Sequence, residues 1–168
     1  MRAAVVILAA IVALAVQTTL ARFLDQGPVA VDLIFVVVVY VALASGPVTG
    51  LLTGTLAGLL QDALSSGVIG IGSLAKTVVG FLVGIVGTQF IVAEPLPRFV
   101  VFFGATFLHA LIFMGLYTML DLRHFGTPYA AVAGQAAGNA VVGVVAFQLA
   151  EMLPGAVERR TQKTKLRR

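Results

Sequence analysis

The chain has 168 residues, of which 60% are hydrophobic and 11% are charged, whereas about 25% of the residues in a soluble domain are charged. Charged residues are missing from four runs, which are too long for the core of one small soluble domain. These runs are residues 33–61, 77–93, 99–120 and 125–150. The composition excludes a water-soluble fold and predicts an all-α integral membrane protein. The absence of cysteine excludes disulfides, thiolate metal sites and thiol nucleophiles.

The first half of the chain predicts three membrane spans, each needing about 20 apolar residues. The first is residues 3–21, which we interpret as an uncleaved helix rather than a signal peptide, because all that follows is also apolar. The run 33–61 would be about 43 Å long as one helix, which is too long for a bilayer. Gly46-Pro47 lies at its middle, and since glycine ends helices and proline starts them, we expect two short helices at about 29–44 and 47–64.

The second half predicts three more spans at about 73–92, 99–120 and 128–150, separated by polar loops and followed by a basic tail at 153–168. This gives six spans, or five if the Gly46-Pro47 hairpin is re-entrant. With six spans, eight basic residues lie on the side of the termini and three on the other, so the positive-inside rule places both termini in the cytoplasm. The eight are Arg2, Arg98, Arg159, Arg160, Lys163, Lys165, Arg167 and Arg168, and the three are Arg22, Lys76 and Arg123.

Charged residues within or beside spans are expensive, and they indicate a functional site by default. The predicted topology places a polar cluster in the outer membrane layer, formed by Asp32, Gln61, Asp62 and Lys76. We expect an ion pair between Asp62 and Lys76, because the short connector 65–72 tethers them. The alternative is a polar, outward-opening cavity for a ligand or partner. Gln61 has the simpler interpretation of a residue that satisfies backbone groups at a helix end.

A second polar cluster is predicted near the membrane midplane and consists of His109, Gln135 and Asn139. Gln135 and Asn139 are four residues apart and therefore share one helix face. The simplest interpretation is a hydrogen bond between helices, worth about 0.6 kcal/mol on average in membrane proteins. The alternative, a proton relay, requires acidic residues in series, and the middle of this sequence has none.

Small residues recur at intervals of four in three predicted spans, namely Gly50, Gly54 and Gly58, then Gly80 and Gly84, then Gly134 and Gly138. Such stripes allow helix backbones to approach closely in lipid. We expect them to pack within the chain, with a partner helix or a homodimer as the alternative. The glycines do not predict a phosphate site, because no P-loop, in which glycine directly precedes Lys-Ser or Lys-Thr, follows any of these runs.

One part of the sequence resembles a known family. The segments that carry the resemblance are Val31-Asp32-Leu33, residues 39–43, Gly46-Pro47, residues 58–65, Gly70 and residues 76–81. Their order and spacing are similar to those of the bacterial rod shape-determining membrane protein family MreD. The resemblance implies a non-enzymatic, multi-pass protein of the bacterial inner membrane, working in the cell-wall elongation machinery. It also implies the partner MreC, proximity to MreB, the glycan polymerase and the transpeptidase, and a fold similar to the six-helix substrate-binding component of energy-coupling-factor transporters.

Two other functions compete with a membrane scaffold. A transporter component that binds a vitamin or another small molecule would use the outer charges to hold a polar ligand. An intramembrane enzyme is disfavoured, because Ser65, Ser66, His109 and His124 form no acyl-transfer motif and no acid and histidine spacing suits a metal. We therefore predict no cofactor and no nucleic-acid partner.

Overall fold

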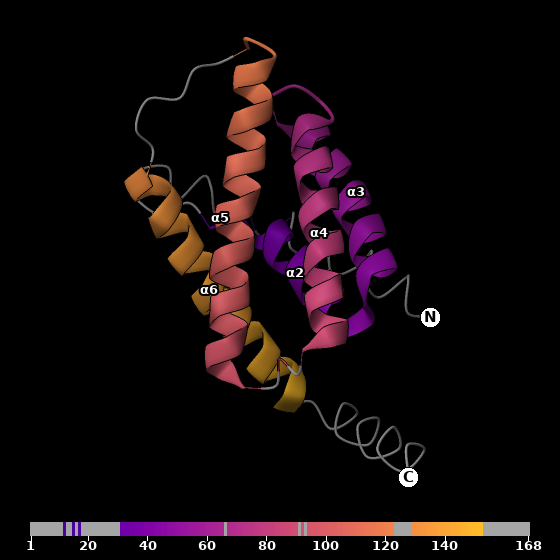
Figure 1. Cartoon of the computed structure of the whole chain (residues 1–168), viewed down its shortest axis with the longest axis vertical. Helices are drawn as coiled ribbons and strands as arrows, with labels where there is room; N and C mark the ends of the chain where they lie inside the picture. Colours follow the sequence, from indigo (N-terminus) through magenta and orange to yellow (C-terminus); the bar gives the residue numbers. More distant parts are fainter. Residues whose placement is uncertain are drawn as a thin grey trace.

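The computed structural model describes residues 31–65, 67–90, 92, 94–122 and 129–152, together with Val12, Ala15 and Gln17. These residues form an all-helical bundle (Figure 1). Its five helices are α2 (Leu33–Ser45), α3 (Pro47–Leu64), α4 (Ile71–Gln89), α5 (Pro95–Met119) and α6 (Tyr129–Met152). Apart from Val12, Ala15 and Gln17, the predicted first span 3–21 lies outside the described residues. The predicted tail 153–168 lies wholly outside them.

Three of the described helices are long and apolar enough to cross a membrane, namely α4 with 19 residues, α5 with 25 and α6 with 24. The described part of the chain therefore has the character of an integral membrane protein, with three candidate spans rather than the predicted six. The second predicted span, 29–44, is shorter than expected. Its helix α2 begins only at Leu33 and has 13 residues, so it is about 20 Å long, which is less than the thickness of a hydrocarbon layer of about 30 Å.

The turn between α2 and α3 has the predicted form. Gly46 ends α2 with φ of 91°, a conformation that side chains other than glycine rarely adopt. Its backbone N–H donates to the carbonyl oxygen of Ala42 at 2.9 Å, and Pro47 occupies the first turn of α3. The two helices therefore turn back on each other without an intervening loop.

Helices α3 and α4 pack with their backbones in close contact, because the glycine stripe of α3 faces α4. A Cβ atom at Gly50 would overlap the carbonyl oxygen of Gly80, and one at Gly54 would overlap that of Lys76. The predicted stripe thus packs within the chain, with Gly58 against Ser73 and Gly84 against Pro47. On α6, Gly134 and Gly138 are half-buried, and their packing role stays a prediction.

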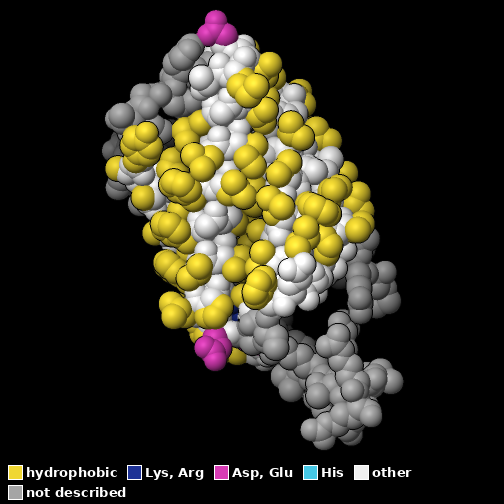
Figure 2. Space-filling view, viewed as in Figure 1, with side chains coloured by type: hydrophobic (Ala, Val, Ile, Leu, Met, Phe, Trp, Pro, Cys, Tyr) yellow, Lys and Arg dark blue, Asp and Glu magenta, His cyan; other side chains and the backbone are white. Residues whose placement is uncertain are grey.

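The core forms around α2, which lies at the centre of the bundle and contacts all four other described helices (Figure 1). Its buried side chains pack against α4, α5 and α6, and the cluster comprises Phe35, Val36, Val39, Ala42, Val79, Val83, Phe102, Ala105 and Ala140. The opposite surfaces of the outer helices carry exposed apolar side chains (Figure 2). An apolar exterior is expected where a helical bundle faces lipid. The arrangement places the start of α2 inside the bundle, where the polar residues gather.

Candidate functional site: a buried polar network at the start of α2

The centre of the network is an ion pair between α2 and α4. Lys76 Nζ lies 3.0 Å from Asp32 Oδ2, and the two side chains are 4% and 9% exposed. Lys76 Nζ also lies 3.3 Å from His109 Nε2 on α5 and 5.8 Å from the centre of the Phe35 ring. Because a lysine ammonium group only donates, Nε2 of His109 can accept this hydrogen bond when the ring carries its proton on Nδ1.

Asp32 also caps the first turn of α2. Its Oδ1 accepts hydrogen bonds from the Phe35 backbone N–H at 2.9 Å and from Gln61 Nε2 at 3.4 Å. Another backbone N–H group of this turn, that of Ile34, donates to Gln17 Oε1 at 3.3 Å. The first N–H groups of a helix have no partner within the helix, and water is scarce inside a membrane bundle. The polar side chains around Asp32 therefore supply the hydrogen bonds that water supplies to helix ends in soluble proteins.

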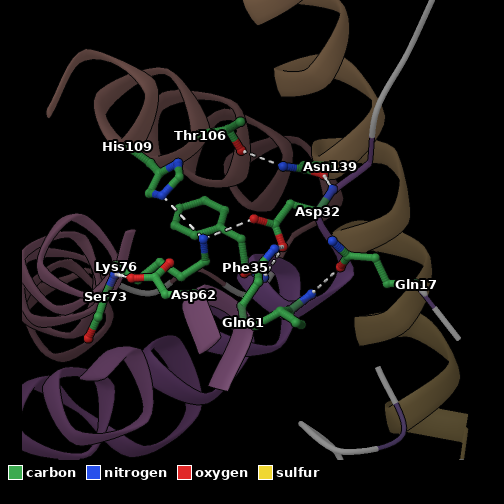
Figure 3. A network of polar contacts seen from close by, with 11 residues as sticks. Gln17, Asp32, Phe35, Gln61, Asp62, Ser73, Lys76, Thr106, His109 and Asn139 are labelled. Atoms are coloured by element: carbon green, nitrogen blue, oxygen red, sulfur yellow. Dashed lines mark hydrogen bonds and ion pairs between the residues drawn. The ribbon is translucent and has the colours of Figure 1, made fainter. Parts of the chain in front are cut away.

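A second branch of the network runs from α2 to α6 and α5 (Figure 3). The backbone N–H of Asp32 donates to Asn139 Oδ1 at 2.8 Å, and Asn139 Nδ2 donates to Thr106 Oγ1 at 3.2 Å. The hydroxyl of Thr106 donates in turn to the carbonyl oxygen of Phe102 at 2.8 Å. Asn139 is fully buried and has partners for both ends of its amide. All five described helices thus contribute to one network.

The predicted partner of Lys76 was wrong. Asp62 does not pair with it, because its Oδ2 accepts the backbone N–H groups of Gly70 and Ser73, both at 2.9 Å. The connector between α3 and α4 folds back so that the open N–H groups of α4 face this carboxylate. Asp62 therefore acts as a cap for α4, which has no capping side chain of its own.

The two predicted polar layers form one network in the structure. His109 and Asn139 were expected at the midplane, whereas Asp32 and Lys76 were expected at the outer boundary. The layers meet because α2 starts inside the bundle, which brings Asp32 to the depth of the residues on α5 and α6. Within the described part of the chain, the hydrogen bonds of this network do not include Gln135, which is half-buried. Gln61 joins it through Nε2, and its Oε1 is buried without a hydrogen-bond partner among the described residues.

The sequence analysis missed a second ion pair at the opposite end of α5. Arg98 is only 1% exposed, and its guanidinium group binds both carboxylate oxygens of Glu151 on α6. Its Nε donates to the carbonyl oxygen of Val92 at 3.3 Å, and its Cζ lies 4.6 Å from the centre of the Phe147 ring. The sequence held one signal of this pair, since Arg98 directly precedes one predicted span and Glu151 directly follows another on the same membrane face.

The chemistry of the network is that of a structural centre with its charges paired. Its donors and acceptors mostly bind each other or the backbone of a neighbouring helix. The described residues contain no group of three His, Cys, Asp or Glu side chains that could hold a metal ion. What the arrangement does is join α2, α3, α4, α5 and α6 at one point of the bundle.

Comparison with known proteins identifies the family. The sequence model of the rod shape-determining protein MreD matches residues 1–150 of this chain. The chain belongs to the MreD family. A search of curated proteins and a search of solved structures found no match. Membership in the MreD family gives this membrane protein a role in rod-shape determination within the cell-wall elongation system. The matched range includes every residue of the polar network and excludes the basic residues at 159–168.

Proposed function

We propose that this member of the MreD family is a non-enzymatic scaffold of the bacterial inner membrane, which maintains rod shape by docking MreC and wall-synthesis proteins. The observation that carries the proposal is the family match over residues 1–150. MreC is the proposed direct partner. The glycan polymerase, the transpeptidase and MreB are proposed to associate indirectly, and a homodimer is the proposal's alternative use of the outer helix faces.

The distribution of polar and apolar groups supports a docking role. The charged residues of the network are turned inward and paired, whereas the outer faces of α5 and α6 are apolar. Within the most apolar 18-residue windows, only 22% of α5 and 28% of α6 are buried inside the bundle. These faces are accessible to lipid and to the apolar helices of other membrane proteins. A scaffold of this kind would work by helix contacts, so that added bulk on a docking face should damage it more than a change of charge.

The proposed topology has six spans, with both termini in the cytoplasm. The arrangement of the described helices supports it. The connection between α3 and α4 and the end of α5 lie at one end of the bundle, while the start of α5 and the end of α6 lie at the other (Figure 1). With the basic residues counted above, the second end is the cytoplasmic one.

Cysteine labelling tests this topology cleanly, because the chain has no cysteine of its own. Cysteine introduced by Ser45→Cys should be shielded from an impermeant reagent added outside the cell. Cysteine introduced by Gly126→Cys should react with the same reagent. Labelling at position 45 from outside would show that the topology is inverted or that the helix count is wrong.

Co-purification from detergent-solubilised membranes, followed by mass spectrometry, tests the proposed partners. Recovery of MreC and wall-synthesis proteins supports the scaffold. Recovery of an ATPase module instead would support the alternative, a substrate-binding transporter component with the fold of the energy-coupling-factor proteins. The observation that favours the alternative is Oε1 of Gln61, which has no hydrogen-bond partner among the described residues and lies on the side chain that contacts Asp32, since a bound polar ligand would satisfy it.

A further inference from the structure

The outer face of α5 carries two glycines that no contact within the bundle explains. A Cβ atom at Gly104 or Gly115 would meet no atom within 4 Å, whereas one at Gly54 would overlap the backbone of α4. Glycine destabilises the interior of a helix relative to alanine. At Gly54 the close contact with α4 offsets this loss of stability. At Gly104 and Gly115 the bundle provides no contact that would offset it.

The two glycines lie on one face of α5, because eleven residues make almost three helical turns, or about 16 Å along the axis. Val100 and Leu111, each four residues before a glycine, are 61% and 51% exposed on the same face. Figure 2 shows uncoloured atoms along α5 with apolar side chains on either side. These four residues form what we call the α5 face. It is apolar and has two places at which another helix backbone can approach closely.

One end of the α5 face is acidic. Glu94 directly precedes α5, and its side chain is exposed. In the proposed topology this end is the cytoplasmic one. The two basic residues in the described part of the chain do not balance this charge at the surface, because Lys76 and Arg98 are turned inward and are only 4% and 1% exposed. A partner on the α5 face would therefore meet negative charge at its cytoplasmic end.

This charge decides between two possible occupants of the α5 face. Two copies of the chain in one membrane have the same orientation, so a two-fold symmetric contact through α5 would place Glu94 beside Glu94. Such a juxtaposition of like charges disfavours a second copy. Membrane helices of other proteins carry an excess of Lys and Arg at their cytoplasmic ends. These side chains would complement Glu94.

We propose that the α5 face is the docking surface for one transmembrane helix of a partner protein, with Lys or Arg at its cytoplasmic end. The inference rests on the proposed function, because it assigns a surface to the docking that a scaffold requires. The partner helix would pack with its backbone close to Gly104 and Gly115, where van der Waals contacts hold membrane helices together. Its basic end would pair with Glu94.

Photocrosslinking in the full chain tests this contact, with MreC as the partner. p-Benzoylphenylalanine would replace Leu111 of α5 or, as the matched control, Leu56 of α3, which are 51% and 56% exposed. In cells that make tagged MreC, irradiation should link MreC to position 111 and not to position 56. Equal linking at both positions, linking at position 56 alone, or a link between two copies of the chain at position 111 would overturn the proposal.

Added bulk gives a second measurement. Gly104→Ile should lower the recovery of MreC by about 5- to 150-fold, the range expected for overpacking a close contact. The thermal midpoint of the isolated protein should stay unchanged, because position 104 is open in the bundle. Leu56→Trp adds bulk to the exposed surface of α3 and should leave both the recovery and the thermal midpoint unchanged. A recovery that fell only for Leu56→Trp would overturn the choice of α5.

Charge variants test the acidic end. Glu94→Lys should lower the recovery of MreC by up to about five-fold, the range of an exposed ion pair, whereas Glu94→Asp keeps the charge and should retain recovery. Full recovery of MreC by both Gly104→Ile and Glu94→Lys would overturn the α5 face as the docking surface and leave the scaffold in place. Failure of the unaltered chain to recover MreC would instead refute the proposed function, and the inference would fall with it.

Discussion

The two ion pairs in the described part of the chain differ in how their charged groups are kept in favourable contacts. Asp32–Lys76 lies within the bundle with both partners buried, and every described helix sends a polar group to it. Arg98–Glu151 lies at one end of α5 and α6, where the glutamate is 40% exposed and the arginine packs on Phe147. A pair far from water needs hydrogen-bond partners from the protein for all of its donors and acceptors. At the surface of the bundle, water can supply some of these hydrogen bonds. The cost of breaking each pair should differ accordingly.

The largest effect is expected at the inner pair. Lys76→Met or Asp32→Asn alone removes one partner of a buried pair and should lower the free energy of unfolding by about 3–5 kcal/mol. The double variant should lose less than either single variant, since no charge is then left unpaired and asparagine still caps α2. Unfolding of purified protein by titration with sodium dodecyl sulfate measures all three. A double variant that loses the sum of the two single losses would show that the pair has no coupling.

A second test concerns how α3 holds Lys76 in place. Gly54→Ala puts a methyl group against the backbone carbonyl of Lys76 and should cost about 1–3 kcal/mol through overpacking. Gly104→Ala on α5 is the matched control, because a Cβ there meets no atom within 4 Å. It should be neutral or stabilise by about 0.5–1 kcal/mol, as expected for an exposed helix position. The thermal midpoint in detergent distinguishes the two.

Recovery of MreC by co-purification adds a functional measurement for the glycine stripe of α3. Gly54→Ile should lower expression and thermal stability, since the stripe packs within the chain. If Gly54→Ile left the isolated protein stable and reduced recovery of MreC, the stripe would be a partner surface. A stable protein with unchanged recovery would show that the stripe faces lipid and that α3 does not pack on α4 as described.

The outer pair should be more tolerant. Glu151→Gln leaves Arg98 with the carbonyl oxygen of Val92 and the Phe147 ring, and water can reach the glutamine. We expect a loss of about 1–2 kcal/mol, discounted from the cost of a fully buried pair because Glu151 is partly exposed. The comparison with Asp32→Asn in the same titration is the measurement. Equal losses at the two sites would contradict the view that water supplies some of the hydrogen bonds at the outer pair.

The sequence was sufficient to predict what depends on local patterns. The Gly46-Pro47 turn follows from the conformational preferences of these two residues, and the packing stripe of Gly50, Gly54 and Gly58 follows from its period of four. Most polar residues of the inner network were also found, because polar groups in apolar runs stand out, namely Asp32, Gln61, Lys76, His109 and Asn139. Gln17 and Thr106, which also join it, were missed. The partners within the network were not predicted, since a partner depends on the depth at which each helix begins. The predicted start at residue 29 put Asp32 at the membrane boundary, whereas α2 begins at Leu33 inside the bundle.

The outer pair shows a second limit of the sequence. Arg98 was counted as a marker of topology, which treats it as a loop residue in contact with water. It is instead buried against α6, because α5 begins at Pro95 rather than at residue 99 and so includes Arg98 in its first turn. Its partner Glu151 is 53 residues away. No local pattern connects two residues so far apart, although both were predicted to lie on one face of the membrane.

The smallest effect is expected at Asp62, the carboxylate that was wrongly predicted to pair with Lys76. Asp62→Asn keeps one oxygen to accept a hydrogen bond from the start of α4 and should cost about 1 kcal/mol, the usual size of a capping effect. Its loss should add to that of Lys76→Met, because no hydrogen bond or ion pair joins the two side chains, and the coupling in a double-mutant cycle should be below about 0.5 kcal/mol. Asp32→Asn with Lys76→Met should instead show strong coupling in the same cycle. Strong coupling at Asp62 and none at Asp32 would reverse the assignment and restore the pair expected from the sequence.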